Sequence, residues 1–259
     1  MKHTPISITF LGTGTSTGVP MIGCSCAVCT SPNPKDNRLR SSILIKSATT
    51  TIVVDTTPDF RYQMLRINNT HLDAVLFTHP HKDHIGGLDD IRPYNHFQNK
   101  TIHVYANALT EEHLRREFYY AFDEKKYAGI PDIALHTITL EPFYIGDVYI
   151  TPILVWHMHM PVYGYRIGDF TYITDANRID QAEKDKLKGN KILVVNALRK
   201  EKHISHFTLA EAIELTQELQ SETTYFTHIS HLLGSHNEVT TELPNNCHLA
   251  YDGLALNIQ

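Results

Sequence analysis

Four residues able to bind a metal ion follow one short apolar segment of the chain. Ala74-Val75-Leu76-Phe77 has the length and character of a buried strand. The four residues that follow it are His79, His81, Asp83 and His84. Side chains two apart in extended backbone project to the same side, so His79 and His81 face one point, whereas Asp83 and His84 lie where the chain turns. Imidazole and carboxylate ligands suit zinc, manganese or iron. The spacing therefore predicts two adjacent cations, with a His-rich solvated loop as the alternative.

The composition limits the classes of protein to which this chain can belong. Its 259 residues, 42% hydrophobic and 20% charged, are enough for a sizeable core of ordinary globular character. A net charge of −5 argues against a general nucleic-acid binder, which would be basic. No apolar stretch reaches the length of a membrane span. Because the first residues lead straight into a strand-like segment without a signal-peptide layout, we expect one cytoplasmic domain over residues 1–259.

Two later strand-like segments end in the same residue types. Residues 148–155 are followed by His157 and His159, and both are candidate ligands. Residues 170–174 are followed by Asp175. One carboxylate has two oxygens, so Asp175 could bridge two cations. A structural aspartate at a strand end is common, but here the other strand ends also carry ligand types.

The C-terminal part adds further histidines. His206 comes just before an amphipathic segment, 208–219, that predicts a helix. His228 and His231 follow a strand-like segment and are three residues apart, so they could serve two different sites. Asp55 ends the strand-like segment 52–54, and two roles stay open for it: orienting a metal-bound histidine or capping the following turn.

Three of the four cysteines lie close together near the N-terminus. Cys24, Cys26 and Cys29 form a C-x-C-x2-C pattern, whereas Cys247 is far away. Without an export-signal pattern, we expect these thiols to be free of disulfides. Three thiols at this spacing suit a tetrahedral zinc that needs one more ligand. The pattern therefore predicts a zinc loop near residues 23–30, with unpaired loop thiols as the alternative.

Local patterns predict the remaining elements. The Gly-rich segment 12–18 does not match the dinucleotide pattern and is better explained as a turn near a metal pocket. Thr110 is a plausible N-cap of a helix over 110–118, and 235–243 predicts a short helix. The final strands, 247–250 and 254–258, have Asp252-Gly253 as the turn between them. The aromatic segment 119–131 is either a loop over the site or surface packing.

The HxHxDH pattern of His79, His81, Asp83 and His84 resembles the signature of the metallo-β-lactamase-fold hydrolases. The resemblance spans nearly the whole chain and is strongest to the PhnP-like phosphodiesterases, which act on a phosphoribosyl cyclic phosphate. It implies an α/β fold, an αββα sandwich with two metals at its rim. The ligand sets that it implies are His79, His81, His157 and Asp175 for the first metal, and Asp83, His84, Asp175 and His228 for the second. His157 is preferred to His159 because its spacing to Gly164 resembles that of the relatives' ligand.

The same resemblance implies a separate structural zinc and a proton donor. The zinc would be bound by Cys24, Cys26, Cys29 and His231. His206 matches the family histidine thought to protonate the leaving group. The family has Asn-His-Asn-Asp there, whereas this chain has Ser205-His206-Phe207-Thr208. The departure affects the expected substrate contact and leaves the metal ligands unchanged.

The expected activity is that of a binuclear metal-dependent phosphodiesterase. Two divalent cations, zinc or manganese, would lower the pKa of a shared water. The metal-bound hydroxide would then attack the phosphorus of a small phosphodiester, such as a cyclic ribose phosphate. His206 and Asp83 are the expected catalytic residues, with Asp83 also a ligand. Neither the native metal nor the physiological substrate follows from the sequence.

The sequence favours three other functions less. The acidic net charge disfavours a tRNA 3′-processing endoribonuclease. In addition, Asp175 follows His157 by only eighteen positions, which leaves no room for the exosite arm of such an enzyme. A thioester or lactone hydrolase is disfavoured by the cysteine loop. A non-catalytic metal-binding protein would lack a ligand, and none is missing. We expect no membrane or nucleic-acid partner, and leave a homodimer open.

Overall fold

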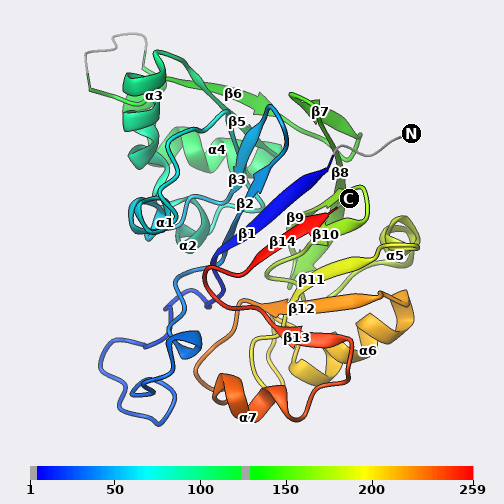
Figure 1. Ribbon diagram of the computed structural model, residues 1–259. Helices are drawn as coiled ribbons and strands as arrows, with labels where there is room; N and C mark the ends of the chain where they lie inside the picture. Colours follow the sequence, from blue (N-terminus) through cyan, green and yellow to red (C-terminus); the bar gives the residue numbers. More distant parts are fainter. Residues whose placement is uncertain (1–4, 124–128, 259) are drawn as a thin grey trace.

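The apolar segments of the chain form two seven-stranded sheets that face each other (Figure 1). The computed structural model describes residues 5–123 and 129–258. In order, the first sheet contains β14 (Ala255–Ile258), β1 (Ile6–Gly12), β2 (Ser42–Lys46), β3 (Thr51–Val54), β4 (Ala74–Leu76), β5 (Ile102–Ala106) and β6 (Ile133–Thr137). The second contains β13 (Cys247–Leu249), β12 (Thr223–Thr227), β11 (Ile192–Asn196), β10 (Phe170–Tyr172), β9 (Met160–Ile167), β8 (Val148–His157) and β7 (Phe143–Ile145).

Helices cover the outer faces of the two sheets (Figure 1). On the first sheet lie α1 (Phe60–Arg66), α2 (Lys82–Ile85), α3 (Arg92–Gln98) and α4 (Ala108–Glu117). On the second lie α5 (Gln181–Leu187), α6 (Leu209–Leu219) and α7 (His236–Thr240). Short 3₁₀ turns span Pro34–Asp36, Leu88–Ile91 and Tyr119–Ala121. The predicted αββα sandwich is therefore confirmed.

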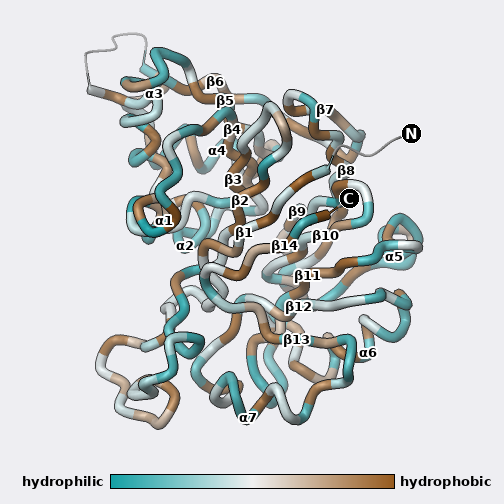
Figure 2. The backbone as a smooth tube through the Cα atoms, viewed as in Figure 1, coloured by the Kyte–Doolittle hydropathy of each residue, from teal (hydrophilic) through white to brown (hydrophobic). Residues whose placement is uncertain are grey.

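Three apolar clusters hold these layers together, and Figure 2 shows the strands as the most hydrophobic part of the chain. The central cluster joins the inner faces of both sheets, with Ile8 and Ile43 from one and Ile150 and Tyr165 from the other. Separate clusters pack the helices on each outer face. Because both faces of each sheet are covered, consecutive residues of central strands such as β2 and β3 are buried, rather than every second one.

The sheet topology brings the predicted ligand segments to one rim. Strands β3 to β6 pair in parallel, and so do β10 to β13. Strand β8 runs in the same direction as β10, because both are antiparallel to β9. The carboxyl ends of such strands share one edge, where α/β proteins bind ligands. The two rims adjoin, since Tyr163 N donates to Thr78 O at 3.0 Å across them.

Two helix predictions needed correction. The helix predicted to begin at Thr110 begins at Ala108, because Asn107 is the N-cap and its side chain accepts from Thr110 N at 2.8 Å. The helix predicted over 235–243 ends at Thr240. There the hydroxyls of Thr240 and Thr241 donate to the carbonyls of His236 and Glu238. By contrast, α6 follows the prediction and begins with a capping box formed by Thr208 and Glu211.

The last two strands do not pair with each other. A turn at Asp252-Gly253 is present as predicted. However, β13 joins the second sheet beside β12, and β14 joins the first beside β1. Ala250 and Leu254 pack in the central cluster between the sheets, so the chain crosses from one layer to the other at this turn.

The described part of the chain contains no helix that is both long and apolar enough to cross a bilayer.

For the aromatic segment 119–131, Tyr120 and Phe122 pack against the helix side of the first sheet, as the surface-packing alternative requires. Residues 124–128 of that segment lie outside the described residues.

Candidate metal centre

Three ligand atoms from other residues meet around one oxygen of Asp175. Asp83, His84, Asp175 and His228 each offer one atom to a group within 4.8 Å. His84 Nε2 lies 3.2 Å from Asp83 Oδ2 and 3.3 Å from Asp175 Oδ1, and His228 Nδ1 lies 3.0 Å from the same Asp175 oxygen. These are the four residues that the family resemblance implies for the second metal.

The other oxygen of Asp175 faces a second set of histidines. His79, His81 and Asp175 form one group of possible ligands, and His157, Asp175 and His206 form another. His79 Nε2 lies 3.2 Å from His81 Nδ1 and 3.8 Å from Asp175 Oδ2. The rings of His81 and His157 are 5.1 Å apart between centroids. The structure therefore brings all residues predicted for the first metal to one side of Asp175. We call the seven predicted ligands the Asp175 cluster: His79, His81, Asp83, His84, His157, Asp175 and His228.

Hydrogen bonds behind the rings fix which imidazole nitrogen faces the cluster. His84 Nδ1 contacts Asp55 Oδ2 at 2.8 Å, so its Nε2 faces inward. Thr78 Oγ1 donates to Asp55 at 2.8 Å and contacts His79 Nδ1 at 2.9 Å. His157 Nδ1 donates to the backbone carbonyl of Asp175 at 3.1 Å. Such contacts set the tautomer of a metal-binding histidine. Of the two roles left open for Asp55, the geometry supports orientation of a histidine.

The backbone at the rim adopts an unusual conformation. Asp55, Asp175 and His228 have positive φ angles of 65°, 55° and 53°. Residues other than glycine seldom occupy this left-handed region, and they cluster there at functional sites. In each case the residue follows directly on a strand or lies just beyond it, so the turn redirects the side chain into the rim.

The charges of the Asp175 cluster favour a cation. Burial lowers the pKa of His79 and His81, and it lowers the pKa of His157 to about 4. These imidazoles are therefore neutral donors near pH 7. Burial alone would raise the pKa of Asp175, but His228 and His84 hold it well below its usual range. Burial alone would lower the pKa of His84, but the carboxylates of Asp175, Asp83 and Asp55 raise it well above its usual value.

The donor set fits divalent cations. Among the described residues, His84 Nε2 and His228 Nδ1 are buried without an aligned hydrogen-bond partner. Buried polar atoms in native proteins are nearly always paired. Both nitrogens point at Asp175 Oδ1, and a cation between these atoms would satisfy all of them. The carboxylates that raise the pKa of His84 show that positive charge is favoured at this place.

A second, separate group of ligands forms beside this rim. Cys24, Cys26, Cys29 and His231 lie within 4.8 Å of one another, and we call them the cysteine cluster. His231 Nδ1 is 3.5 Å from Cys24 Sγ and 3.3 Å from Cys26 Sγ. Backbone N–H groups of Cys29 and Met21 donate to the sulfurs of Cys26 and Cys29, both at 3.4 Å. Three thiols and one imidazole are the ligand set of a structural zinc.

Other sequence predictions can now be placed. His206 lies next to Asp175, with Nε2 3.3 Å from Oδ2. His159 is exposed at the turn between β8 and β9 and is outside the ligand groups. The sequence reasoning missed Thr78, Ser205 and His203, which contact His79 or His206 through side-chain atoms. Only the density of histidines around 203–206 could have pointed to the last two.

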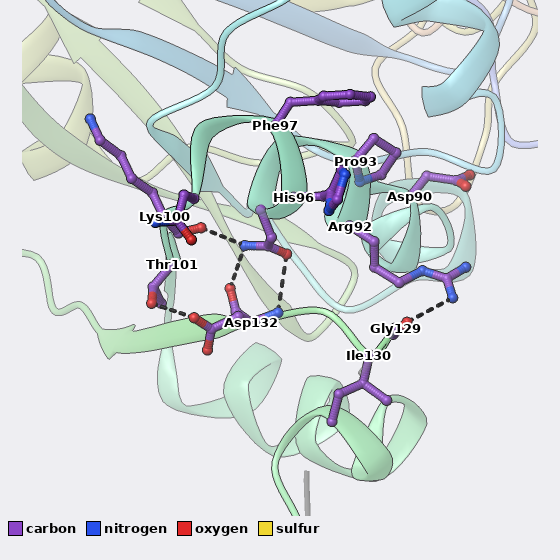
Figure 3. A pocket seen from close by; sticks show the side chains of 12 residues that line it. Asp90, Arg92, Pro93, His96, Phe97, Lys100, Thr101, Gly129, Ile130 and Asp132 are labelled. Carbon is purple, nitrogen blue, oxygen red and sulfur yellow. Dashed lines mark hydrogen bonds between the residues drawn. The ribbon is translucent and has the colours of Figure 1, made fainter. Parts of the chain in front are cut away.

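A cavity of about 720 Å³ lies elsewhere, between α3 and the chain that enters β6 (Figure 3). Its walls include Arg92, Asn95 and Asp132. Asn95 Nδ2 donates to the carbonyls of Lys100 and Asp132 at 2.9 and 2.8 Å, and Arg92 donates to the Gly129 carbonyl at 3.1 Å. Figure 3 shows these bonds running between wall residues. No lining residue belongs to the Asp175 cluster.

Comparison with known proteins agrees with this fold. Residues 50–229, more than half of the chain, match the sequence model of the Beta-lactamase superfamily domain. The chain therefore belongs to the metallo-β-lactamase superfamily. A solved structure described as a new diphosphatase from the PhnP family is 39% identical, with a TM-score of 0.93 over 99% of this chain and 98% of that one. Within the superfamily, this protein is a metal-dependent hydrolase close to the PhnP-like enzymes.

Two further relatives complete the comparison. A Porphyromonas gingivalis protein named octanoyltransferase is 38% identical over 247 residues, which cover 94% of this chain. This chain spans only about half, 50%, of that protein's length. The zinc-bound structure of PqqB from Methylobacterium extorquens is 18% identical, with a TM-score of 0.79 over 97% of this chain and 100% of that one. At that identity the likeness concerns the fold alone.

Proposed function

We propose that the protein hydrolyses a small phosphodiester at two divalent cations, zinc or manganese, bound on either side of Asp175. The observation that carries the proposal is the pair of ligand sets that meet at the two oxygens of this one carboxylate. His79, His81, His157 and Asp175 would hold one cation. Asp83, His84, Asp175 and His228 would hold the other. A third cation, a structural zinc, would occupy the cysteine cluster.

The residues around the proposed cations have different roles in hydrolysis. Bound divalent cations would supply Lewis acidity, which activates water and offsets charge on the phosphoryl oxygens. Asp55 and Thr78 orient the ligand rings. His206 is buried, with Nε2 facing Asp175, where it could deliver a proton to the departing oxygen. The expected catalytic role of Asp83, the half-buried ligand, stays a prediction.

A diphosphate is the second candidate substrate, because the PhnP-family relative at 39% identity is described as a diphosphatase. Diphosphate and diester hydrolysis both need a water, a charged phosphoryl group and a departing oxygen, so the same residues could serve either. The relative named octanoyltransferase is twice as long as the part that this chain covers, so its name does not indicate the substrate of this chain. An octanoyl thioester is therefore used only as a comparison substrate. The cytoplasmic location and the lack of nucleic-acid or membrane partners stay predictions, and the oligomeric state stays open.

The test is steady-state hydrolysis of bis(p-nitrophenyl) phosphate by zinc- or manganese-loaded protein. p-Nitrophenyl phosphate, ADP and an octanoyl thioester would be assayed beside it, with Asp175→Ala as the variant. Diester turnover that the variant lacks would support the proposal. Turnover of ADP without turnover of the diester would favour a diphosphatase. If protein shown to hold its metals hydrolyses only the thioester, the phosphoryl chemistry proposed here is wrong.

A further inference from the structure

Two exposed apolar residues flank the histidines on one side of Asp175. Met158 directly follows the predicted ligand His157, and Ile204 precedes His206 by two positions. Met158 is 42% exposed and Ile204 is 73% exposed. The ring centroids of His157 and His206 are 4.7 Å apart. The two apolar residues therefore flank the same part of the rim, beside the proposed first cation.

One side chain holds the two segments together. Asn177 Oδ1 accepts from Met158 N at 2.9 Å, and Asn177 Nδ2 donates to the Ile204 carbonyl at 2.9 Å. The backbones of these two residues, far apart in the sequence, thus lie on either side of one amide group. Single exposed apolar residues are common on protein surfaces, but two that are brought together beside a candidate site need an explanation. We call these two residues the Met158–Ile204 patch.

Met158 occupies a backbone position that favours glycine. It is the first residue of the two-residue turn between β8 and β9, because His157 pairs with Met160, and its φ is 58°. Glycine adopts this left-handed conformation without steric cost, whereas other residues found there cluster at functional sites. Formation of the turn therefore does not require a methionine. A contact with a bound molecule explains the long apolar side chain better.

The nearest lysines before Ile204 are already paired with carboxylates. Lys200 Nζ lies 2.6 Å from Glu242 Oε2, and Lys202 Nζ lies 2.9 Å from Glu211 Oε1. A second phosphate beside the patch would have to compete with these carboxylates for the two lysines. An uncharged apolar group meets no such competition and can cover the exposed side chains of the patch.

We propose that the Met158–Ile204 patch binds an apolar ester group of the substrate, so that the preferred substrate is a phosphodiester with an alkyl or aryl group on one oxygen. The inference rests on the proposed function, because that function places the phosphoryl group at the Asp175 cluster. Transfer of an apolar group from water onto apolar side chains is favourable in proportion to the area that is buried. A longer alkyl chain should therefore bind more tightly than a methyl group.

The test compares two diesters that differ in one ester group, dimethyl phosphate and hexyl methyl phosphate. Calorimetry would measure their binding to zinc-loaded protein. The variants are Met158→Gly and Ile204→Ser, with Leu65→Ser as the control, because Leu65 is 60% exposed on α1. The wild type should bind hexyl methyl phosphate about 10-fold more tightly or better, since each methylene removed from water strengthens binding by up to about 4-fold. Each patch variant should reduce this ratio to about 3-fold or less, and the control should keep it.

Inhibition, stability and metal content give the remaining readouts. Hexyl methyl phosphate should inhibit hydrolysis of bis(p-nitrophenyl) phosphate competitively. Met158→Gly should not lower Tm, because glycine suits the φ of 58°, and both patch variants should contain as much metal as the wild type.

Equal affinity of the wild type for the two diesters, a preference that both patch variants keep, or inhibition that is not competitive would overturn the inference. A lower Tm or a lost metal in Met158→Gly would overturn it too, since the residue would then have a structural role. A preference that depends on the patch, in metal-loaded protein that hydrolyses no diester, would refute the proposed function instead.

Discussion

Asp175 is the single residue on which both proposed cation sites depend. Its two oxygens face different histidines, and its side chain is almost fully buried. Asp175→Asn preserves the shape but removes the charge that bridges the two sets. We expect diester turnover to fall by about 100-fold or more, because removal of an outer-shell contact alone typically costs 10–100-fold.

The change should also release metal from both sites at the rim, which elemental analysis after gel filtration would measure. Asp185→Asn is the matched control, since that carboxylate is 51% exposed on α5. An Asp175→Asn protein that keeps all its metal and its turnover would show that the two ligand sets do not share this carboxylate.

Asp55 contacts a predicted metal ligand without belonging to the ligand groups. It is fully buried, contacts His84 Nδ1, and accepts from both the backbone N–H and the hydroxyl of Thr78. Asp55→Asn should weaken metal affinity at the rim by about 10- to 100-fold, because His84 loses the partner that fixes its tautomer. Competition with a chelator would measure the affinity. Unchanged affinity at the rim would mean that Asp55 only stabilises the turn.

At the scale of elements, the cysteine segment stands apart from both sheets and depends on its own ligands. In Figure 1 it is the blue loop that projects at the lower left. Cys26→Ser should remove one metal equivalent and about 2–3 kcal/mol of stability, a fall in Tm of roughly 5–10 °C for a domain of this size. Metal analysis and calorimetry would check this.

Cys247→Ala is the control for that experiment, because Cys247 is buried in the apolar cluster under α6 and is not part of the cysteine cluster. It should retain every metal. If Cys26→Ser retained its metal and its Tm as well, the cysteine cluster would be a set of unpaired thiols.

The first residue of α7 links pH to stability. Burial, with Arg38 beside it, lowers the pKa of His236 from 6.5 to about 4. The unfolded chain therefore binds more protons than the folded one between these values, so stability falls as pH drops from about 6.5 to 4. Between pH 7.5 and 5.0 the wild type should lose about 1–2 kcal/mol more than His236→Gln, measured by urea unfolding. Equal losses would assign the acid sensitivity to other groups.

The strand-end position of the ligands was predictable, and their grouping was not. The apolar run before His79 and the two-residue spacing to His81 are local features, and the structure places both side chains as expected. The choice of His157 over His159 required the family resemblance, because both follow the same strand. Only the fold shows that β8 ends at His157 and that His159 lies in the turn.

Other features depend on contacts between segments far apart in the sequence. The role of Asp55 follows from its contact with His84, which no local pattern encodes. The turn at Asp252-Gly253 can be predicted from the sequence, but the sheet that each flanking strand joins depends on pairing with β1 and β12. Asn107 and Thr110 are both acceptable N-caps in sequence, and the structure chooses Asn107.

At the scale of the whole molecule, two sheets each contribute part of the proposed metal centre. The first sheet supplies His79, His81, Asp83 and His84, and the second supplies His157, Asp175 and His228. Neither half contains a complete ligand set for either cation. Metal binding at the rim should therefore stabilise the packing of the sheets against each other, since a ligand that binds only the folded state stabilises it.

The most direct test of the central claim is a titration of chelator-treated protein with Mn²⁺ while bis(p-nitrophenyl) phosphate hydrolysis is followed. The cysteine cluster would be filled with zinc beforehand, and the Asp175→Asn variant would be run in parallel. Activity should rise to a plateau at two equivalents of manganese per chain, and the variant should stay inactive. Full activity at one equivalent would contradict the binuclear site, and no activity at any ratio in metal-loaded protein would contradict the phosphodiesterase.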